Sequence, residues 1–517
     1  MKFIYFVVAA LSILFIQVNG LRVLGIIPFP SKSHFAIGNG IIESLVDAGH
    51  DVTVMSPYPQ KKNRENYHEI DVSKILEIFE SDKHEVNPFV FGQFPAVGVM
   101  FMLAKMNSDI VDLFMANKEV QKFINEDQKY DICIFETFLV DSLLGIAEKT
   151  DCVIVSFLTF AAVRWTDDMT GNDSPTSYVP NPFLHYTDRM SFKERLWNTA
   201  FSLIERGIYQ GYYMPRQRKL YSKYFPNAKR SFEEIYFNTS IFFSNTHVSS
   251  NTIRPSMPNI VEIAGIHVKP VKPLPVDIQE FLDSATDGAI LFSMGSFIQS
   301  KQWPVEKREA FVRTFGKLKQ KILWKYENET LPNNPGNIKI GSWIPQRDIL
   351  AHPNVKLFIT HGGLLGTTEA IVEGVPILGI PIFGDQKLNM AKSVMKGYGL
   401  QINFDDVTEE TVTQSINELL SNPKYKSNAV EISERFKDRP MTPQQSVVYW
   451  TEYAARHQGA SHLKAQSTAL SFIEFHLIDI YCTLLAIFIA FGYIKFVILR
   501  MIFRRIFKKS PEKQKRS

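Results

Sequence analysis

The sequence predicts an α/β protein in which two doubly wound parallel sheets face a cleft, followed by one membrane-spanning helix. Three observations indicate this architecture. Short apolar strands alternate with amphipathic helices, a proline-rich linker at Lys269–Pro275 interrupts the alternation, and a long apolar segment lies near the C-terminus. With 517 residues the chain is also too long for a single hydrophobic core.

The first half opens with a strand, a helix and a second strand. Arg22–Pro28 is a short apolar run, His34–Ala48 has helical spacing and stops at a glycine, and Asp51–Met55 is apolar again. The pattern recurs at Asp131–Phe135 and Cys152–Phe157. Such βαβ units build a parallel sheet.

The alternation resumes after the linker. Strands are predicted at Ala289–Ser293, Lys321–Trp324 and Lys356–Thr360, with a helix near 304–320 between the first two. The aromatic and basic region 172–236 is predicted to be helical. In doubly wound sheets ligands bind at the carboxyl ends of the strands, so the cleft between the two sheets is the expected site.

Both ends of the chain are apolar. Lys2, the run Phe3–Ile16 and the small residues before Gly20 are typical of a signal peptide cut after Gly20. An uncleaved anchor is the alternative, but the run is short for a membrane span. Ile480–Leu499 is long enough to cross a bilayer as a helix, and Lys495 is its only charge.

The positive charge of the chain is concentrated in its tail. Residues 500–517 carry a net charge of +7 and the whole chain +4, so the rest sums to −3 and no basic face indicates nucleic acid. The basic side of a membrane helix stays cytoplasmic, which makes the preceding chain lumenal or extracellular. Lys513–Ser517 resembles the K-x-K-x-x signal for return to the endoplasmic reticulum.

Two further features bear on a lumenal location. Acceptor motifs for N-glycosylation occur at Asn172, Asn238 and Asn328. Cys133 and Cys152 lie in strand-like apolar runs, and we expect buried free thiols there rather than a disulfide.

These boundaries divide the chain into segments. We expect a signal peptide at 1–20, an N-terminal Rossmann-like domain at 21–268, a linker at 269–275, a C-terminal Rossmann-like domain at 276–440, a helical segment at 441–476, a transmembrane helix at 477–499 and a basic cytoplasmic tail at 500–517.

A glycine-rich turn connects a predicted strand to a predicted helix. Thr360–Glu369 reads THGGLLGTTE and directly follows the Lys356–Thr360 strand. Glycines let the backbone approach a ligand, and free N–H groups at a helix start bind phosphate oxygens. A turn of this kind also occurs for tight packing alone, so the neighbouring residues decide its meaning.

Those neighbours carry a family resemblance. Trp343-Ile-Pro-Gln346, His361-Gly-Gly, Glu369, Gly374-Val-Pro376, Pro381 and Phe383-Gly-Asp-Gln386 with Asn389 closely resemble the signature of the UDP-glycosyltransferase family. These are GT-B enzymes that glycosylate small lipophilic molecules. The Leu-Leu pair after His361-Gly-Gly is similar to insect members. Vertebrate members usually carry Asn at the position of Leu365, so its contribution to diphosphate binding either comes here from backbone N–H groups or is missing.

The resemblance implies that the N-terminal domain, 21–268, binds the acceptor and that the C-terminal domain, 276–440, binds the UDP-sugar. It also implies a set of donor-binding roles. Trp343 would stack on uracil, Gln346 would contact the uridine, and Glu369 would accept hydrogen bonds from the ribose. The diphosphate would be held by His361, Gly363, Gly366 and Ser296. The sugar hydroxyls would be bound by Asp385 and Gln386.

The resemblance also implies a catalytic base. His34 occupies the family's place for it, and a helix N-terminus keeps a histidine neutral and able to accept a proton. A carboxylate must orient the base. Family members place Asp where this chain has Glu136, and Asp141 at a helix start is the alternative partner.

The expected reaction is the inverting, metal-independent transfer of a hexose from a UDP-sugar to a hydroxyl of a small lipophilic acceptor. Glucose is the expected sugar, and glucuronate is the alternative. Lipid or protein acceptors, or a non-catalytic binding protein of the same fold, are the alternatives. No cofactor or metal is expected, because the lumenal part contains no Asp-x-Asp motif. The expected partners are the UDP-sugar, the acceptor and a membrane of the endoplasmic reticulum. No nucleic acid is expected, and a homo-oligomer is compatible with the sequence.

Overall fold

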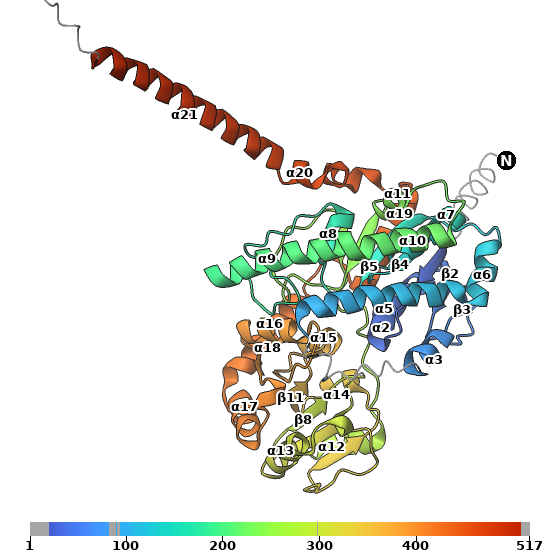
Figure 1. Cartoon of the computed structure of the whole chain (residues 1–517). Coiled ribbons are helices and arrows are strands. Elements are labelled where there is room, and N and C mark those ends of the chain that lie inside the picture. Colours follow the sequence, from blue (N-terminus) through green and yellow to red (C-terminus); the bar gives the residue numbers. More distant parts are fainter. Residues whose placement is uncertain (1–19, 82–88, 90–91, 93, 297, 508–517) are drawn as a thin grey trace, which may run out of the picture. The chain divides into compact units, whose positions relative to one another are not determined.

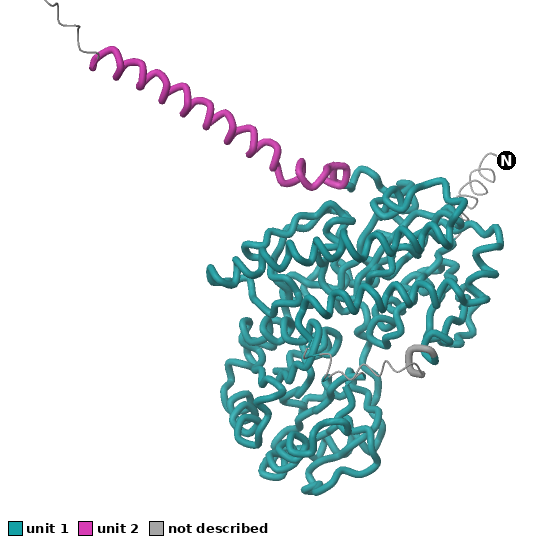
Figure 2. Tube along the Cα trace, in the orientation of Figure 1, with its two compact units in different colours: residues 1–464 teal, residues 465–517 magenta. Residues whose placement is uncertain are grey.

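The computed structural model describes residues 20–81, 89, 92, 94–296 and 298–507. The predicted signal peptide, apart from Gly20, and the last ten residues of the tail lie outside this range. The chain divides into two compact units, residues 1–464 and residues 465–517 (Figure 2). The first unit contains both parallel sheets, and the second contains the apolar C-terminal helix.

The first sheet is parallel throughout and has the strand order β3-β2-β1-β4-β5-β6-β7. Its strands are β1 (Arg22–Ile26), β2 (Asp51–Ser56), β3 (Tyr67–Asp71), β4 (Ile132–Glu136), β5 (Val153–Leu158), β6 (Ile241–Ser244) and β7 (Ile260–Glu262). The direction of winding reverses between β1 and β4. Loops leaving these two strands therefore diverge and open a crevice at their carboxyl ends.

The second sheet is also parallel, with the order β10-β9-β8-β11-β12-β13. Its strands are β8 (Ala289–Ser293), β9 (Lys321–Lys325), β10 (Ile338–Gly341), β11 (Val355–Thr360), β12 (Ile377–Gly379) and β13 (Gly399–Gln401). Its crevice opens between β8 and β11. Two doubly wound sheets on either side of a linker confirm the predicted fold class.

Helices cover both faces of each sheet (Figure 1). Around the first sheet they are α2 (Lys32–Asp47), α3 (Lys74–Ser81), α5 (Ala96–Ala116), α6 (Lys118–Asn125), η1 (Asp141–Leu144), α7 (Gly145–Thr150), α8 (Arg164–Thr170), α9 (Phe192–Ile208), η2 (Tyr209–Tyr213), α10 (Met214–Tyr224) and α11 (Phe232–Tyr236). Around the second they are α12 (Val276–Asp283), η3 (Ser300–Gln302), α13 (Val305–Gly316), α14 (Gln346–Leu350), α15 (Leu364–Glu373), α16 (Gln386–Met395), η4 (Phe404–Asp406), α17 (Glu409–Ser421) and α18 (Pro423–Lys437).

Alternate residues of the central strands enter different cores. Leu24 of β1 and Phe135 of β4 belong to one buried cluster, whereas Val23 and Ile134, their chain neighbours, belong to the cluster on the other face. A sheet that buries both faces needs apolar residues at every position, which explains the continuous apolar runs in the sequence. These runs allow the central strands to be predicted from the sequence.

The chain returns to the first sheet after completing the second. Helix α19 (Pro443–Arg456) packs against α2 and near β5 and β6, and it buries Val447 and Ala454 in the same cluster as Ile41. The segment 441–476 thus begins with a helix that completes the first domain. The short turn η5 (Ser461–Leu463) follows it in the first unit.

The second unit is almost entirely helical. It contains η6 (Gln466–Ala469), α20 (Phe472–Phe475) and α21 (Ile478–Ile506). In the described part of the chain, α21 is the one helix long and apolar enough to cross a membrane, and none of its apolar window is buried. The helix continues past Leu499, the predicted end of the span, as far as Ile506.

A disulfide joins Cys133 to Cys152, so the expectation of free thiols is wrong. Cys133 lies in β4, and Cys152 immediately precedes β5, which pairs with β4 in parallel. This register brings their Cα atoms to 5.7 Å, within the range that a disulfide spans. The apolar pattern indicated burial of both residues, but it contained no information about their proximity.

Replacing both cysteines with alanine should lower the free energy of unfolding by about 2–4 kcal/mol, because the disulfide restricts the unfolded chain. Urea unfolding of the detergent-solubilised protein measures this. Cys482→Ala is the matched control, since this cysteine is exposed and free. An unchanged midpoint in the double variant would mean that the bond does not form.

Candidate active site

The side chains of His34 and Glu136 meet at the crevice of the first sheet, where the neighbouring strands β1 and β4 end. Ile26 at the end of β1 pairs with Phe135 of β4. Glu136 ends β4, and His34 lies in the first turn of α2, the helix that follows β1. Glu136 Oε1 contacts His34 Nδ1, and Glu136 Oε2 accepts a hydrogen bond from the backbone N–H of Phe29 at 3.4 Å.

The surroundings of His34 orient its ring. The rings of Phe29 and Phe138 lie 4.4 and 4.9 Å from it, and the Thr159 hydroxyl lies 3.4 Å from Nδ1. Glu136 is fully buried, whereas the His34 side chain keeps 14% of its surface exposed. With Nδ1 engaged by the carboxylate, Nε2 is the nitrogen available to take a proton.

The alternative carboxylate has different partners. Asp141 is buried, and its Oδ2 accepts hydrogen bonds from Tyr209 and Tyr213 at 3.0 and 2.9 Å. Burial raises the pKa of Asp141 to about 6. In the structure, Glu136 therefore contacts His34, whereas Asp141, at the start of η1, contacts two tyrosines.

His361 sits between two glycines in the second sheet's crevice. It follows β11, opposite Gly295 after β8. A Cβ on Gly295 would lie 2.6 Å from His361 Cε1, and one on Gly363 would lie 2.3 Å from His361 Nε2. Burial, reinforced by the charge of Lys325, lowers the pKa of His361 to about 4, so the imidazole is neutral near pH 7.

The predicted uridine-binding residues cluster along α14 and α15. Gln346 Nε2 donates a hydrogen bond to Glu369 Oε2 at 2.6 Å. Burial raises the pKa of Glu369 to about 7, an effect that this bond opposes. Trp343 has 71% of its surface exposed, which leaves its indole face open to a flat base. Lys32 of α2 places its Nζ 5.6 Å from that ring.

The remaining diphosphate candidates lie at the same crevice. Gly366 is buried in the first turns of α15, where an added Cβ would lie 3.2 Å from Gln346 Nε2, and Ser296 is exposed after β8. Leu365 packs against a core cluster of the first domain. Its carbonyl also accepts a hydrogen bond from His267 Nε2 at 3.2 Å. Leu365 thus joins the two domains.

The predicted sugar-binding pair begins α16. Asn389 Nδ2 donates to Asp385 Oδ2 at 2.8 Å, and burial raises the pKa of Asp385. Gln386 Oε1 already accepts hydrogen bonds from the backbone N–H groups of Ile382 and Phe383 at 2.8 and 3.1 Å. Only the amide N–H groups of Gln386 remain for a sugar hydroxyl. Sequence analysis did not identify this restriction.

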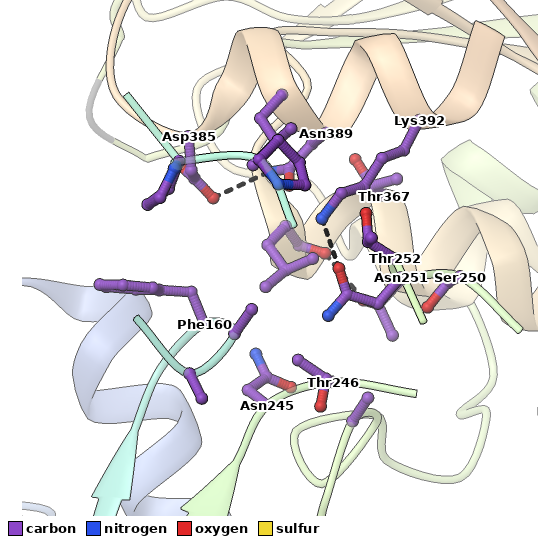
Figure 3. A pocket seen from close by; sticks show the side chains of 18 of the residues that line it. Phe160, Asn245, Thr246, Ser250, Asn251, Thr252, Thr367, Asp385, Asn389 and Lys392 are labelled. Atoms are coloured by element: carbon purple, nitrogen blue, oxygen red, sulfur yellow. Dashed lines mark hydrogen bonds between the residues drawn. The ribbon is translucent and has the colours of Figure 1, made fainter. Parts of the chain in front are cut away.

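The two halves of the site face one another inside the first unit. One cavity is lined by residues that follow β5 and β6 together with residues of α15 and α16. Figure 3 shows this cavity with Asp385 and Phe160 on opposite walls. The sugar-binding candidate Asp385 therefore lines the same cavity as Phe160, whose chain neighbour Thr159 lies beside His34.

The sequence offers several apolar groups of the N-terminal domain as linings of the acceptor pocket, namely Phe89–Phe91, Phe94, Val97–Met102 and the aromatics between Phe157 and Trp165. Of these, Phe160 lines the cavity, next to Ala161, Ala162 and Val163. Phe89 packs instead against Phe404 of the second domain, with ring centroids 4.9 Å apart, and Val99 and Met100 are buried in α5. Phe91 lies outside the described residues.

The three glycosylation motifs differ in accessibility. Asn172 has 6% of its surface exposed, and its amide nitrogen donates to Asp167 and to the Pro255 carbonyl. The folded structure thus excludes a glycan there. Asn238 is half-buried and accepts a hydrogen bond from Lys464. Asn328 is exposed and remains the accessible candidate.

Comparison with known proteins agrees with this geometry. Residues 23–514 match the family model described as UDP-glucoronosyl and UDP-glucosyl transferase. The chain is 39% identical to UDP-glycosyltransferase UGT5 of Dactylopius coccus, over 91% of this chain and 90% of that protein. It is 34% identical to UDP-glucosyltransferase 2 of the same insect over the full length of both. It is also 28% identical to 2-hydroxyacylsphingosine 1-beta-galactosyltransferase of Rattus norvegicus, over 94% of this chain and 89% of that protein.

Solved structures share the fold. Glycosyltransferase VinC, solved in complex with dTDP, aligns with a TM-score of 0.56 and 14% identity, covering 84% of this chain and 100% of that one. CalG4, the calicheamicin glycosyltransferase, aligns with a TM-score of 0.56 and 13% identity, covering 85% and 99%. The fold is therefore GT-B. The chain belongs to the UDP-glycosyltransferase family and is a glycosyltransferase that uses a UDP-sugar.

Gly363→Ala tests the predicted diphosphate role of His361. The backbone of Gly363, with φ −62°, accepts any residue, so only the Cβ is new. Because that Cβ overlaps His361 Nε2, the ring must turn away, and we expect UDP to bind at least about tenfold more weakly. Calorimetric titration with UDP measures this. Gly98→Ala is the control, since its Cβ meets open space. Equal affinity in both variants would separate His361 from UDP binding.

Glu369→Gln tests the ribose role through pH. In the folded state the pKa of Glu369 is about 7, above its ordinary value of 4.5. Between these two values the folded state holds a proton that the unfolded chain releases, so the stability contributed by this group falls as pH rises. A ribose diol needs the ionised carboxylate as acceptor. UDP affinity should therefore rise by up to about tenfold per pH unit below pH 7 and level off above it.

The Glu369→Gln variant should lose most of that pH dependence, because His361, with a pKa of about 4, stays neutral through the same window. The titration of UDP itself affects both proteins equally, so it cancels in the difference between their pH profiles of UDP affinity. Parallel pH profiles of the UDP dissociation constant would show that Glu369 does not contact the ligand.

Proposed function

We propose that this enzyme transfers glucose from UDP-glucose to a hydroxyl group of a small lipophilic acceptor, with inversion at the anomeric carbon and without a metal ion. The observation that carries the proposal is the contact between His34 and Glu136 at the cleft, with His34 Nε2 left available. Glucose is preferred to glucuronate because the chain is 34% identical over its full length to a protein named as a UDP-glucosyltransferase.

The proposed step has one bond forming and one breaking. His34 Nε2 takes the proton of the acceptor hydroxyl as its oxygen attacks the anomeric carbon from the face opposite UDP. The bond from that carbon to the diphosphate oxygen breaks, and UDP leaves with the electron pair. Glu136 is positioned to stabilise the imidazolium that forms, since its Oε1 contacts the Nδ1 side of the ring. An α-linked donor gives a β-glycoside.

The leaving group is proposed to be stabilised by the protein alone. The turn after β11 offers backbone N–H groups at the start of α15, and the helix dipole favours negative charge there. His361 adds a neutral imidazole donor, held between Gly295 and Gly363. These groups are already in place before reaction, which is the condition for electrostatic stabilisation of a developing charge.

The lipophilic character of the acceptor is proposed from the walls of the cleft. Phe29 and Phe138 flank His34, and Phe160 to Val163 line the adjoining cavity. A flat or alicyclic alcohol would bury apolar surface against these groups while its hydroxyl meets His34.

The enzyme is further proposed to be a single-pass protein of the endoplasmic reticulum with its catalytic domains in the lumen. The disulfide between Cys133 and Cys152 fits an oxidising compartment. Arg500, Arg504 and Arg505 at the end of α21 fit a cytoplasmic end for that helix. Asn328 is the acceptor that such a location would expose to glycosylation.

His34→Ala should lower kcat by about 10²–10⁴-fold, because it removes the base, while UDP still binds. Glu136→Gln should cause a smaller loss, since the amide occupies the same place without the charge. Release of UDP from UDP-glucose with a panel of phenols and steroids measures turnover, and calorimetry measures UDP binding.

Asp141→Asn is the matched control and should leave kcat unchanged, because Asp141 contacts Tyr209 and Tyr213 rather than His34. Full activity of the His34→Ala variant would refute the proposed base. A wild-type chain that binds UDP but turns over no acceptor, lipids included, would favour a non-catalytic binding protein.

A further inference from the structure

The cavity beside the proposed base has one apolar wall and one polar wall. The apolar wall is formed by Phe160 to Val163 and by Val179, Pro180 and Pro182. The polar wall is formed by the loop after β6, from Asn245 to Arg254, and by α15 and α16. In Figure 3 Asn251, Thr252 and Lys392 lie close together on this polar side.

Lys392 is a buried cation on the polar wall. It projects from α16 with 8% of its surface exposed, and its Nζ donates to Asn251 Oδ1. Within the described residues it forms no ion pair. Burial lowers the pKa of Lys392 to about 8, so it still carries a proton near pH 7. No role in the proposed mechanism accounts for it.

The charged groups around Lys392 leave it largely uncompensated. Asp385 and Asp188 favour its charge, whereas Lys396 and Arg254 oppose it. Asp385 bonds to Asn389, and its own pKa is raised by burial. The guanidinium of Arg254 is already paired with Asp167 through Nη2. The polar wall therefore presents positive charge at Lys392.

The same wall contains buried polar atoms that lack a partner among the described residues. These are the Thr252 hydroxyl, Asn245 Oδ1 and Arg254 Nε. Asn245 uses its amide nitrogen to bind the Thr159 carbonyl at 2.8 Å, which leaves its oxygen free to accept. Buried polar groups without partners are unfavourable, so a cluster of them around a cavity indicates a polar ligand.

We infer that this cavity binds a carboxylate carried by the acceptor, with Lys392 and Thr252 donating to its oxygens and the acceptor's rings lying on the Phe160–Val163 wall. This inference rests on the proposed function and specifies its substrate class: hydroxylated aromatic or alicyclic acids rather than neutral lipophiles. Asn245 Oδ1 would accept a hydrogen bond from a second hydroxyl of such a molecule.

The position of Lys392 assigns the carboxylate to the acceptor and not to a glucuronate donor. Asp385, the predicted sugar contact, begins α16, and Lys392 lies about 10 Å further along the helix axis, at roughly 1.5 Å per residue. Its hydrogen-bond partner Asn251 and its neighbour Thr252 belong to the first domain, which supplies His34. The donor contacts all belong to the second domain.

The test compares 6-hydroxy-2-naphthoate with its methyl ester, using UDP-glucose and the full-length enzyme. The wild type should favour the acid. In Lys392→Met the ratio of kcat/KM for acid over ester should fall about 10- to 100-fold, the effect of a hydrogen bond to a charged group. Thr252→Val should lower the same ratio by a smaller factor and tests the site without removing a charge.

Lys396→Met is the matched control, because it removes a lysine from the end of the same helix outside the cavity, and its ratio should equal that of the wild type. Equal losses for acid and ester in Lys392→Met, with Thr252→Val unchanged, would overturn the inference. So would a shift in the preference between UDP-glucose and UDP-glucuronate, which would assign the carboxylate to the donor.

Failure of the proposed function gives a different result, namely no transfer to acid or ester by the wild type. Equilibrium binding of the fluorescent naphthoate in the presence of UDP still tests Lys392 in that case. Weaker binding of the acid to Lys392→Met than to Lys396→Met supports the inference, and equal binding overturns it.

Discussion

The parallel pairing of β1 with β4 is the constraint on which the rest of the site depends. Because the winding of the first sheet reverses between these two strands, the chain leaves them in opposite directions, and a crevice opens where they end. His34 and Glu136 come from the two sides of that crevice and meet at Nδ1. Residues that are 102 positions apart in the sequence therefore act as one unit, and the orientation of the ring follows from the register of the sheet.

The second sheet has the same reversal of winding, but a different side chain lies in its crevice. Its crevice, between β8 and β11, is occupied by an imidazole that fits only because Gly295 and Gly363 have no side chain. The two glycines leave room for the His361 ring, next to the free N–H groups at the start of α15. Leu365 of the same turn makes an apolar contact with the first domain, so this turn also contributes to the packing of the two domains.

Burial determines the electrostatics of the cleft. Glu369, Asp385 and Lys392 are each removed from water, and the pKa of each is displaced toward its uncharged form. Groups in this condition respond strongly to a bound ligand, because a ligand supplies the hydrogen bonds that water no longer provides. Under the proposed assignment, Glu369 and Asp385 would meet the donor and Lys392 the acceptor, so acidic groups would face one substrate and a basic group the other.

The sequence by itself determined the strands on both sides of each crevice, the glycine-rich turn and the family signature, because buried parallel strands are continuously apolar and the signature is contiguous along the chain from Trp343 to Asn389. It did not predict the outer strands β3, β6, β7, β10, β12 and β13. It did not reveal the Cys133–Cys152 bond, the burial of Asn172 or the engagement of the Gln386 oxygen, since each depends on which segments become neighbours. The choice between Glu136 and Asp141, and the setting of Lys392 among residues of the other domain, were likewise decided only by the tertiary structure. Local patterns record what each segment buries, whereas the register between distant strands decides which side chains meet.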